Sequence, residues 1–291
     1  MAWAVNLGHS KIFFYRDKTY TMKADGLLTP PFANDALQGR IAVVCGSTQG
    51  IGFAAAEVLA GMGAQVILVA RNEEKLKECV AVLPQAHLNH SYLVADFTID
   101  AEVDALAEKL SSLEVNILVN NTGGPAGGKI MEAQPQAFLQ AFHAHLLANH
   151  KLTTAVLPGM KKQAYGRIIN VISTSVKQPL PNLGVSNTIR GAVANWAKTM
   201  ANEVAPFGIT VNNVLPGATA TGRLENIIAN KAHNSGKESS DVAAEMTREI
   251  PAGRFGEAIE IAYAIGFLAS PYAAYINGIN LPVDGGRTAS L

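Results

Sequence analysis

The sequence has little of what marks secreted, metal-binding or nucleic-acid-binding proteins. Only two cysteines occur in 291 residues, Cys45 and Cys79, and they have neither CxxC spacing nor histidine companions. A disulfide framework and a metal site are therefore not expected. Lysine plus arginine equals aspartate plus glutamate, at 23 each, which gives no electrostatic reason to expect nucleic acid or an anionic membrane as a partner. No apolar run approaches the roughly 20 residues that a membrane-spanning helix needs, so we expect a soluble, cytoplasmic protein.

Apolar residues, in contrast, make up 48% of the chain, and they follow a regular alternation that begins at Leu37. Short β-branched runs predict strands and longer amphipathic stretches predict helices. The expected strands are residues 41–45, 66–70, 92–95, 115–120, 167–172, 209–214 and 278–283. The expected helices are residues 53–60, 73–83, 102–110, 135–160, 186–205 and 257–269. This order predicts an α/β fold: a Rossmann-type doubly wound parallel sheet, three-layer α/β/α, in a single domain.

Two segments do not share this alternation. Residues 1–36 are expected to be an N-terminal extension, either an arm packed on a neighbour, a short appended hairpin or a flexible tail. Residues 221–250, within the domain of residues 37–291, are polar and charged and contain Gly236. This composition predicts a mobile lid at about 221–250.

The rest of the chain is organised around one glycine-rich stretch. The apolar run Ile41–Cys45 leads into Gly46, Gly50 and Gly52, and then into a strong helix former over residues 53–60. A strand, a glycine turn and a helix in this order form a cradle for a phosphate, because the helix N-terminus offers free N–H groups to the anion. A plain strand-to-helix turn is the alternative. The sequence favours a dinucleotide site.

The end of the second strand indicates which dinucleotide is bound. A carboxylate about 20 residues after the glycines would accept the 2′-hydroxyl of NAD, but this strand ends in Ala70, Arg71 and Asn72. Ala70 leaves room for a 2′-phosphate, and the planar guanidinium of Arg71 can bind one. An ordinary surface arginine is the alternative. We expect NADP(H) to be preferred over NAD(H).

At these motifs the chain resembles the short-chain dehydrogenase/reductase family, and within it the 3-oxoacyl-(acyl carrier protein) reductases. The resemblance covers about residues 37–286. It rests on the GxxxGxG of residues 46–52, Asp96, the Asn-Asn-Thr-Gly of residues 120–123, residues 166–173, residues 211–217 with Thr221, and the Val-Asp-Gly-Gly of residues 283–286. It implies an NADP-dependent oxidoreductase that acts on a small-molecule carbonyl or alcohol, such as a ketone or a 3-oxoacyl group. It also implies a homotetramer or homodimer, assembled through residues 135–160, residues 186–205 and the C-terminal strand.

The resemblance also implies the cofactor-binding residues. Asp96 and Phe97 would frame the adenine, Asn120 and Gly123 would lie along the adenosine ribose and the central sheet, and Pro216, Gly217 and Thr219 would meet the nicotinamide amide. Each role has a structural alternative: Asn120 could simply tie two strands together, and Pro216-Gly217 could be only a turn. The complete expected set is Gly46, Ser47, Thr48, Gln49, Gly50, Ile51, Gly52, Arg71, Asn72, Asp96, Phe97, Asn120, Thr122, Gly123, Arg190, Pro216, Gly217 and Thr219.

The catalytic positions depart from the family. The family uses Asn, Ser, Tyr and Lys, with Tyr and Lys spaced YxxxK. Ser173 matches the serine, but the tyrosine falls on Ser186, the lysine on Arg190 and the asparagine on His145. Three of the four catalytic identities have therefore changed.

These substitutions bear directly on proton transfer to the carbonyl oxygen. A phenol has a pKa near 10, whereas an aliphatic hydroxyl is a much weaker acid, and Ser186 would need a bridging water to reach the phenol position. Arg190 keeps a positive charge but cannot lose a proton. His145, with an ordinary pKa near 6.5, is the best candidate for a new proton donor; a hydrogen-bonded core histidine is the alternative.

Three explanations remain open at this point. The protein is a reductase with a rebuilt donor, or it binds NADP(H) without redox turnover as a sensor, scaffold or partner subunit, or it runs a non-redox reaction such as a dehydration or retro-aldol cleavage. The resemblance favours the first, and the lost tyrosine fits the second.

Overall fold

A seven-stranded, all-parallel sheet forms the centre of the computed structural model, which describes residues 3–7, 10–15, 18–21 and 35–290. The strand order is β12-β9-β8-β7-β4-β5-β6, and each pair is parallel. The strands are β4 (Ile41–Cys45), β5 (Gln65–Ala70), β6 (Ser91–Val94), β7 (Ile117–Asn120), β8 (Gly166–Val171), β9 (Ile209–Pro216) and β12 (Asn280–Val283). The predicted doubly wound α/β domain is confirmed.

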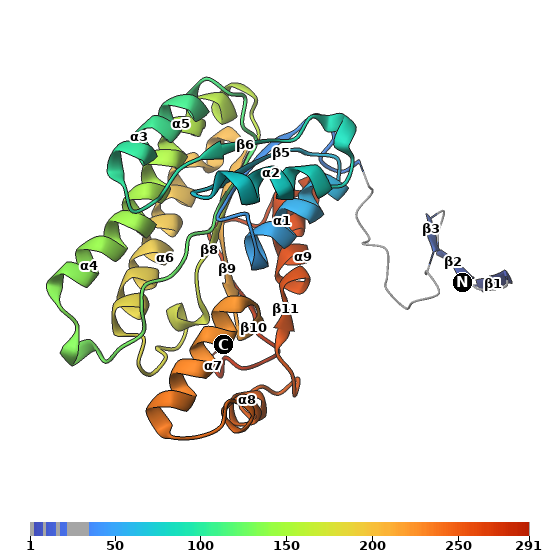
Figure 1. Ribbon diagram of the computed structural model, residues 1–291. Helices are drawn as coiled ribbons and strands as arrows, with labels where there is room; N and C mark the ends of the chain where they lie inside the picture. The colour runs from blue at the N-terminus through green and yellow to red at the C-terminus, as the bar shows by residue number, and fades with distance from the viewer. Residues whose placement is uncertain (1–2, 8–9, 16–17, 22–34, 291) are drawn as a thin grey trace.

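Helices cover both faces of this sheet, as Figure 1 shows. One face carries α1 (Gly50–Gly61), α2 (Glu73–Val82) and α9 (Ala258–Ala269), and the other carries α3 (Asp100–Ser111), α5 (Ala148–Lys162) and α6 (Gly184–Val204). The strands supply both layers, because successive side chains point to opposite faces. In β4, Val44 joins the core under α1 and α9, whereas Val43 and Cys45 join the core under α3, α5 and α6.

The expected helix over residues 135–160 is continuous but not uniform. It consists of α4 (Pro135–Ala141), a π-helical segment (Phe142–Leu147) and α5. A π-turn adds a residue to the helical repeat and is frequent at functional sites. The turn rotates His145, within it, to a buried position, whereas Phe142 stays partly exposed.

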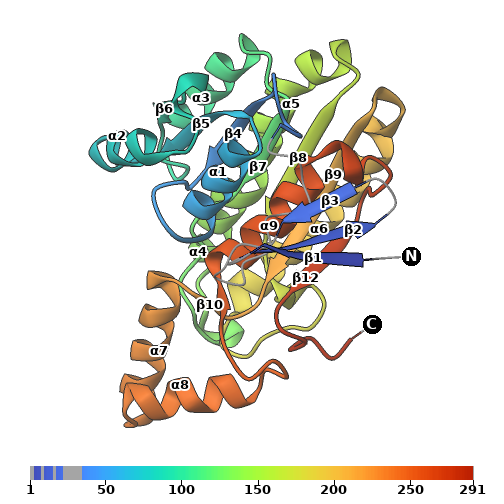
Figure 2. The same cartoon turned by 90° about the vertical axis from the view of Figure 1, so that its right-hand side faces the viewer.

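The segment expected to be a lid contains two helices, α7 (Gly222–Ser235) and α8 (Ser239–Arg248). They pack on each other through Leu224, Ala232, Val242 and Met246 and lie at one end of the molecule in both views (Figures 1 and 2). The two-residue strands β10 (Thr219–Ala220) and β11 (Gly256–Glu257) pair beneath them. Since β10 follows β9 directly, α7 begins at the edge where the strands of the sheet end.

The N-terminal extension contains a separate antiparallel sheet. Its strands are β1 (Trp3–Leu7), β2 (Ser10–Tyr15) and β3 (Lys18–Thr21), joined in the order β1-β2-β3. The prediction of an arm, hairpin or flexible tail for residues 1–36 falls partly outside the described residues.

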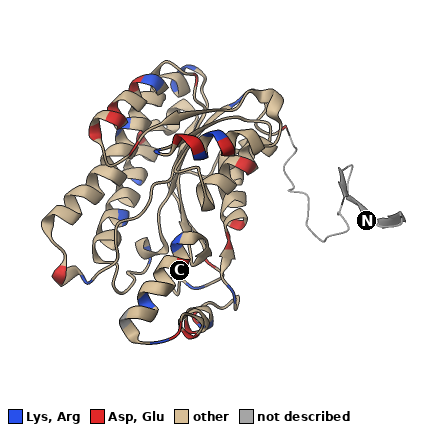
Figure 3. Ribbon diagram, viewed as in Figure 1, with Lys and Arg blue, Asp and Glu red and all other residues tan. Residues whose placement is uncertain are grey.

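Charge is spread over the outer helices. Acidic and basic positions are mixed along α2, whereas those of α3 are mostly acidic (Figure 3). Ion pairs such as Lys151 with Asp100 and Asp104 join neighbouring helices at 2.9 and 2.7 Å. Within the part of the chain that the structure describes, no helix is long and apolar enough to cross a membrane.

Candidate nucleotide and catalytic site

The glycine loop between β4 and α1 has room only for glycine at two positions. Gly46 has φ +60°, and a Cβ there would lie 2.3 Å from the carbonyl oxygen of Asn121; a Cβ on Gly52 would lie 2.1 Å from the carbonyl oxygen of Gly46. The N-cap of α1, Gln49, makes no side-chain cap, so the first N–H groups of the helix stay free for an anion. The loop therefore fits the diphosphate of a dinucleotide.

Two polar residues hold this loop in place. Ser47 is fully buried, and its hydroxyl accepts a hydrogen bond from the Val69 N–H at 3.0 Å. The amide of Asn121 donates to the carbonyls of Cys45 and Gly46, both at 3.2 Å. The Ser47 side chain thus ties the loop to β5. Asn121 was missed, although it lies within the Asn-Asn-Thr-Gly motif.

The end of β5 presents the arginine expected to read the ribose phosphate. The side chain of Arg71 is 78% exposed, and its Nη1 lies 3.7 Å from Oδ2 of Asp96, at the end of β6. Hydrogen bonds from Thr98 hold the pKa of Asp96 below its usual range. Asn72 caps α2 by accepting from the Lys75 N–H at 3.0 Å. Among the described residues, the Arg71 side chain is thus held only by this long, exposed contact, which a phosphate can replace.

A ladder of asparagine amides crosses four neighbouring strands of the sheet. Asn120 donates to Asn170 at 2.9 Å, Asn170 to Asn213 at 2.9 Å, and Asn213 to Asn280 at 2.8 Å. The four residues are directly paired across β7, β8, β9 and β12. Asn120 therefore ties strands together, which was the structural alternative for this residue.

The residues expected near a nicotinamide gather around the end of β9. Pro216 closes this strand, and the Gly217 N–H donates to the Val283 carbonyl at 3.0 Å. A Cβ on Gly217 would lie 2.7 Å from Cα of Asp284. Thr219 is buried and donates to the Gly217 carbonyl at 3.1 Å. This turn thus lies at the same edge of the sheet as the glycine loop.

His145 is enclosed and uncharged at neutral pH. It is 2% exposed, and its Nδ1 shares a hydrogen bond of 2.5 Å with the hydroxyl of Thr122. Burial, together with the positive charges of Arg190 and Arg223, lowers the pKa of His145 to about 3. The expectation that an ordinary pKa near 6.5 makes it a proton donor is therefore wrong, because the buried ring carries no extra proton at pH 7.

The substituted catalytic positions on α6 lie beside this histidine. Arg190 is 7% exposed and donates to the carbonyls of Val171, at 3.1 Å, and Thr122, at 3.5 Å. Burial and the charge of Arg223 lower its pKa to about 10, so it remains a cation at pH 7. Ser186, one helical turn earlier, is also buried. Ser173, at the end of β8, accepts from the Ser175 N–H at 3.1 Å.

A further cation, Arg223, was missed by the sequence analysis. It lies in the first turn of α7, and its Nη1 donates to the Gly124 carbonyl at 3.2 Å. The contact spans 99 residues of chain. The sequence does place a basic residue two positions after Thr221, which belongs to the motif shared with the family.

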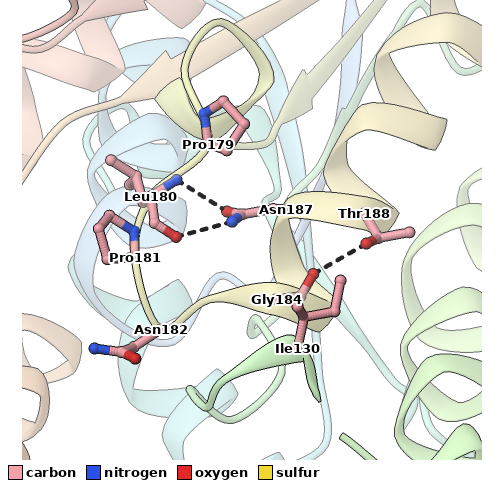
Figure 4. Close-up of a pocket in the computed structure, with 8 residues that line it drawn as sticks. All are labelled: Ile130, Pro179, Leu180, Pro181, Asn182, Gly184, Asn187 and Thr188. Carbon is pink, nitrogen blue, oxygen red and sulfur yellow. Dashed lines mark hydrogen bonds between the residues drawn. The ribbon is translucent and has the colours of Figure 1, made fainter. Parts of the chain in front are cut away.

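A shallow pocket of about 490 Å³ opens beside the start of α6. Figure 4 shows its wall, formed by the loop before α6, where the Asn187 amide bonds to both backbone groups of Leu180. Its lining consists of Ile130, Pro179, Leu180, Pro181, Asn182, Gly184, Asn187 and Thr188. Ser186 and Arg190 do not line this pocket, so it flanks the predicted catalytic positions rather than containing them.

The structure thus brings the expected residues together along one edge of the sheet. The glycine loop, Arg71 and the turn after β9 lie at the carboxyl ends of the strands, where such sheets bind ligands. The predicted catalytic positions lie near the end of β8: Ser173 follows that strand, Ser186 and Arg190 lie on α6, and His145 lies in the π-helical segment.

Comparison with known proteins agrees with this geometry. A family model described as enoyl-(acyl carrier protein) reductase matches residues 46–288. The 3-oxoacyl-[acyl-carrier-protein] reductase FabG of Vibrio cholerae is 37% identical over 253 residues, which cover 86% of this chain and 98% of that protein.

Two crystal structures extend the likeness to three dimensions. L-sorbose reductase from Gluconobacter frateurii, in complex with NADPH and L-sorbose, has a TM-score of 0.82 and 31% identity, and the match covers 89% of this chain and all of that one. YwfH, an NADPH-dependent reductase involved in bacilysin biosynthesis, has a TM-score of 0.81 and 28% identity, with 87% and 99% covered. The chain belongs to the short-chain dehydrogenase/reductase family of oxidoreductases.

Proposed function

We propose that this protein is an NADP(H)-dependent reductase of a ketone or 3-oxoacyl group with a rebuilt catalytic site. The observation that carries the proposal is the glycine loop, closed to any side chain at Gly46 and Gly52 and followed by an uncapped helix N-terminus. Arg71, at the end of β5, supports the choice of NADP(H). The relatives of known structure that act with NADPH support the same cofactor.

The cofactor, when bound, would supply the hydride. The chain's own part is to hold the carbonyl and to stabilise the negative charge that develops on its oxygen. Arg190 is suited to this, because it is a cation at neutral pH in a buried position. The hydroxyls of Ser173 and Ser186 are further hydrogen-bond donors. With the phenol absent, the proton would come from water, and Arg190 would stabilise the oxyanion until it arrives.

Arg71 is expected to distinguish the two cofactors. Replacing Arg71 with Gln should weaken NADPH binding by roughly 10- to 100-fold, since a hydrogen-bonded charge pair is worth about 1.5–3 kcal/mol, and should leave NADH binding within about twofold. Fluorescence titration of the purified protein measures both. Arg248→Gln, which removes an exposed cation from α8, is the matched control. Equal losses for NADPH and NADH would contradict the assignment of Arg71.

A second candidate function is cofactor binding without carbonyl turnover, as in a sensor or scaffold. It is favoured by the neutral state of His145, which removes the imidazolium as a replacement for the tyrosine. Single-turnover oxidation of bound NADPH by a panel of ketones and 3-oxoacyl thioesters separates the two. Oxidation by any of them supports the reductase; tight NADPH binding with no oxidation supports the second candidate.

A further inference from the structure

Two arginines at the catalytic edge, Arg190 and Arg223, are near enough to interact electrostatically, and neither has an acidic partner among the described residues. Arg190 donates only to the carbonyls of Val171 and Thr122, and Arg223 donates only to the carbonyl of Gly124. Among the residues that the structure describes, neither guanidinium forms an ion pair. Each guanidinium has five N–H donors, so both keep donors and a full charge for something else.

The backbone is shaped to admit Arg223. A Cβ on Gly124 would lie 2.5 Å from Nη2 and 2.7 Å from Nη1 of Arg223. Gly124 does not have a left-handed φ, so its own backbone conformation does not require glycine there. The absence of a side chain is what allows the guanidinium to lie against the loop after β7.

The charges in this cluster are all of one sign. The charge of Arg223 lowers the pKa values of both Arg190 and His145, and that of Arg190 lowers the pKa of His145 further. In the described part of the chain, no acidic group raises the pKa of His145 or of Arg190. Arg190 is the buried cation of this cluster, and a buried cation without a counter-charge destabilises the fold. An anion bound beside it would reduce that cost.

We infer that the substrate carries an anionic group, a carboxylate or a phosphate, and that Arg190 and Arg223 bind it beside the reacting carbon. The inference rests on the proposed function, because only a reductase would bind a substrate at this edge of the sheet. The diphosphate of the cofactor has the same chemistry, and Thr221, at the start of α7, lies 3.2 Å from the position of a Cβ on Gly50 in the glycine loop. Arg190 lies on α6 and donates to the carbonyls of Val171 and Thr122 rather than to the glycine loop, which favours the substrate as the source of the anion.

Matched ligands separate the two sources. Isothermal titration calorimetry with 4-oxopentanoate, its methyl ester and inorganic phosphate is run on the full chain, both free and saturated with NADPH. In the wild type, the acid and phosphate should bind at least tenfold more tightly than the ester. Arg223→Gln should weaken the acid and phosphate by roughly 10- to 100-fold, as expected for the loss of a charge-assisted hydrogen bond. NADPH binding should stay within about twofold.

Three further variants test whether the position of the charge matters. Gly124→Ala should displace the guanidinium without removing any charge and should reproduce most of the loss. Arg223→Lys should retain part of the affinity, because a lysine supplies a point charge without the planar fork. Arg248→Gln removes a cation from the neighbouring helix α8 and should change nothing.

Two outcomes would overturn the inference. One is that acid, phosphate and ester bind the wild type equally or not at all at millimolar concentration. The other is that Arg223→Gln weakens NADPH by tenfold or more and leaves the ratio of acid to ester affinity unchanged, which would assign the arginine to the cofactor diphosphate. Failure of the proposed function would be a separate result, namely no NADPH binding by the wild type. In that case the anion titrations on cofactor-free protein would still measure whether the two arginines bind an anion.

Discussion

Replacing His145 with Asn, Ser186 with Tyr and Arg190 with Lys in one variant is expected to raise the rate of reduction of a neutral ketone by roughly 10²- to 10⁴-fold, the usual contribution of a positioned general acid. The three changes restore the family's identities at positions whose surroundings, from Ser173 to the glycine loop, are already in place. A phenol with a pKa near 10, lowered by a neighbouring ammonium, would then replace water as the proton donor. NADPH oxidation with a ketone that has no acidic group measures the gain.

His145 has to be replaced together with Ser186 and Arg190 because space at this site is limited. Ser186 is 5% exposed and His145 is 2% exposed, so a tyrosine at 186 adds bulk to a filled region, at a cost of about 1–3 kcal/mol. The Ser186→Tyr, Arg190→Lys double variant, which keeps His145, is the matched control and should gain less. Circular dichroism and NADPH titration verify that each variant is folded. A folded triple variant that binds NADPH and reduces no ketone would mean that the cleft is rebuilt beyond these three positions.

The second large effect is on acid stability. The pKa of His145 is about 3 in the folded protein and 6.5 without perturbation, so the unfolded chain binds a proton that the folded chain does not. The stabilisation from this neutral, buried ring is complete above pH 6.5 and is lost as the pH falls from 6.5 towards 3, at about 1.4 kcal/mol per pH unit. Between pH 6.5 and pH 4.5 the wild type should lose about 2 kcal/mol through this group alone.

His145→Asn should remove this part of the pH dependence. Urea unfolding at a series of pH values measures the free energy of unfolding, and the quantity to compare is its slope with pH, because the substitution also changes packing. His87→Asn, on the exposed turn of residues 86–88, should leave the wild-type slope unchanged. A His145→Asn protein with the wild-type slope would show that other groups account for the acid sensitivity.

The fold and the nucleotide cradle could be predicted because their signals are local. The residues that make the turn at Gly46 and Gly52 lie next to the strand and helix that they join. Central strands such as β4 and β8 are short, buried runs rich in β-branched residues. The strand ends were predicted to within two residues, with β9 running two residues further, to Pro216.

The chemistry of the catalytic edge could not be predicted in the same way. The pKa of His145 depends on Arg190 and Arg223, which join it only in the folded chain. The contact of Arg223 with Gly124 connects segments 99 residues apart, and glycine at 124 has a reason only once that contact is known. The π-helical segment that orients His145 also has no counterpart in the apolar periodicity of residues 135–160, which predicted a plain helix.

The amide ladder has a consequence for what can meet Asn120. Each amide donates to the carbonyl oxygen of the next, so the four side chains are all oriented in one direction, and reversing one would require reversing all. The oxygen of Asn120 is left without a partner among the described residues, and it forms the negative end of this polarised chain. Asn280 on the edge strand β12 thereby sets the orientation of the Asn120 oxygen on β7, three strands away and beside the glycine loop. Whatever group reaches Asn120 must therefore arrive as a donor, with a hydroxyl or an N–H pointing towards it.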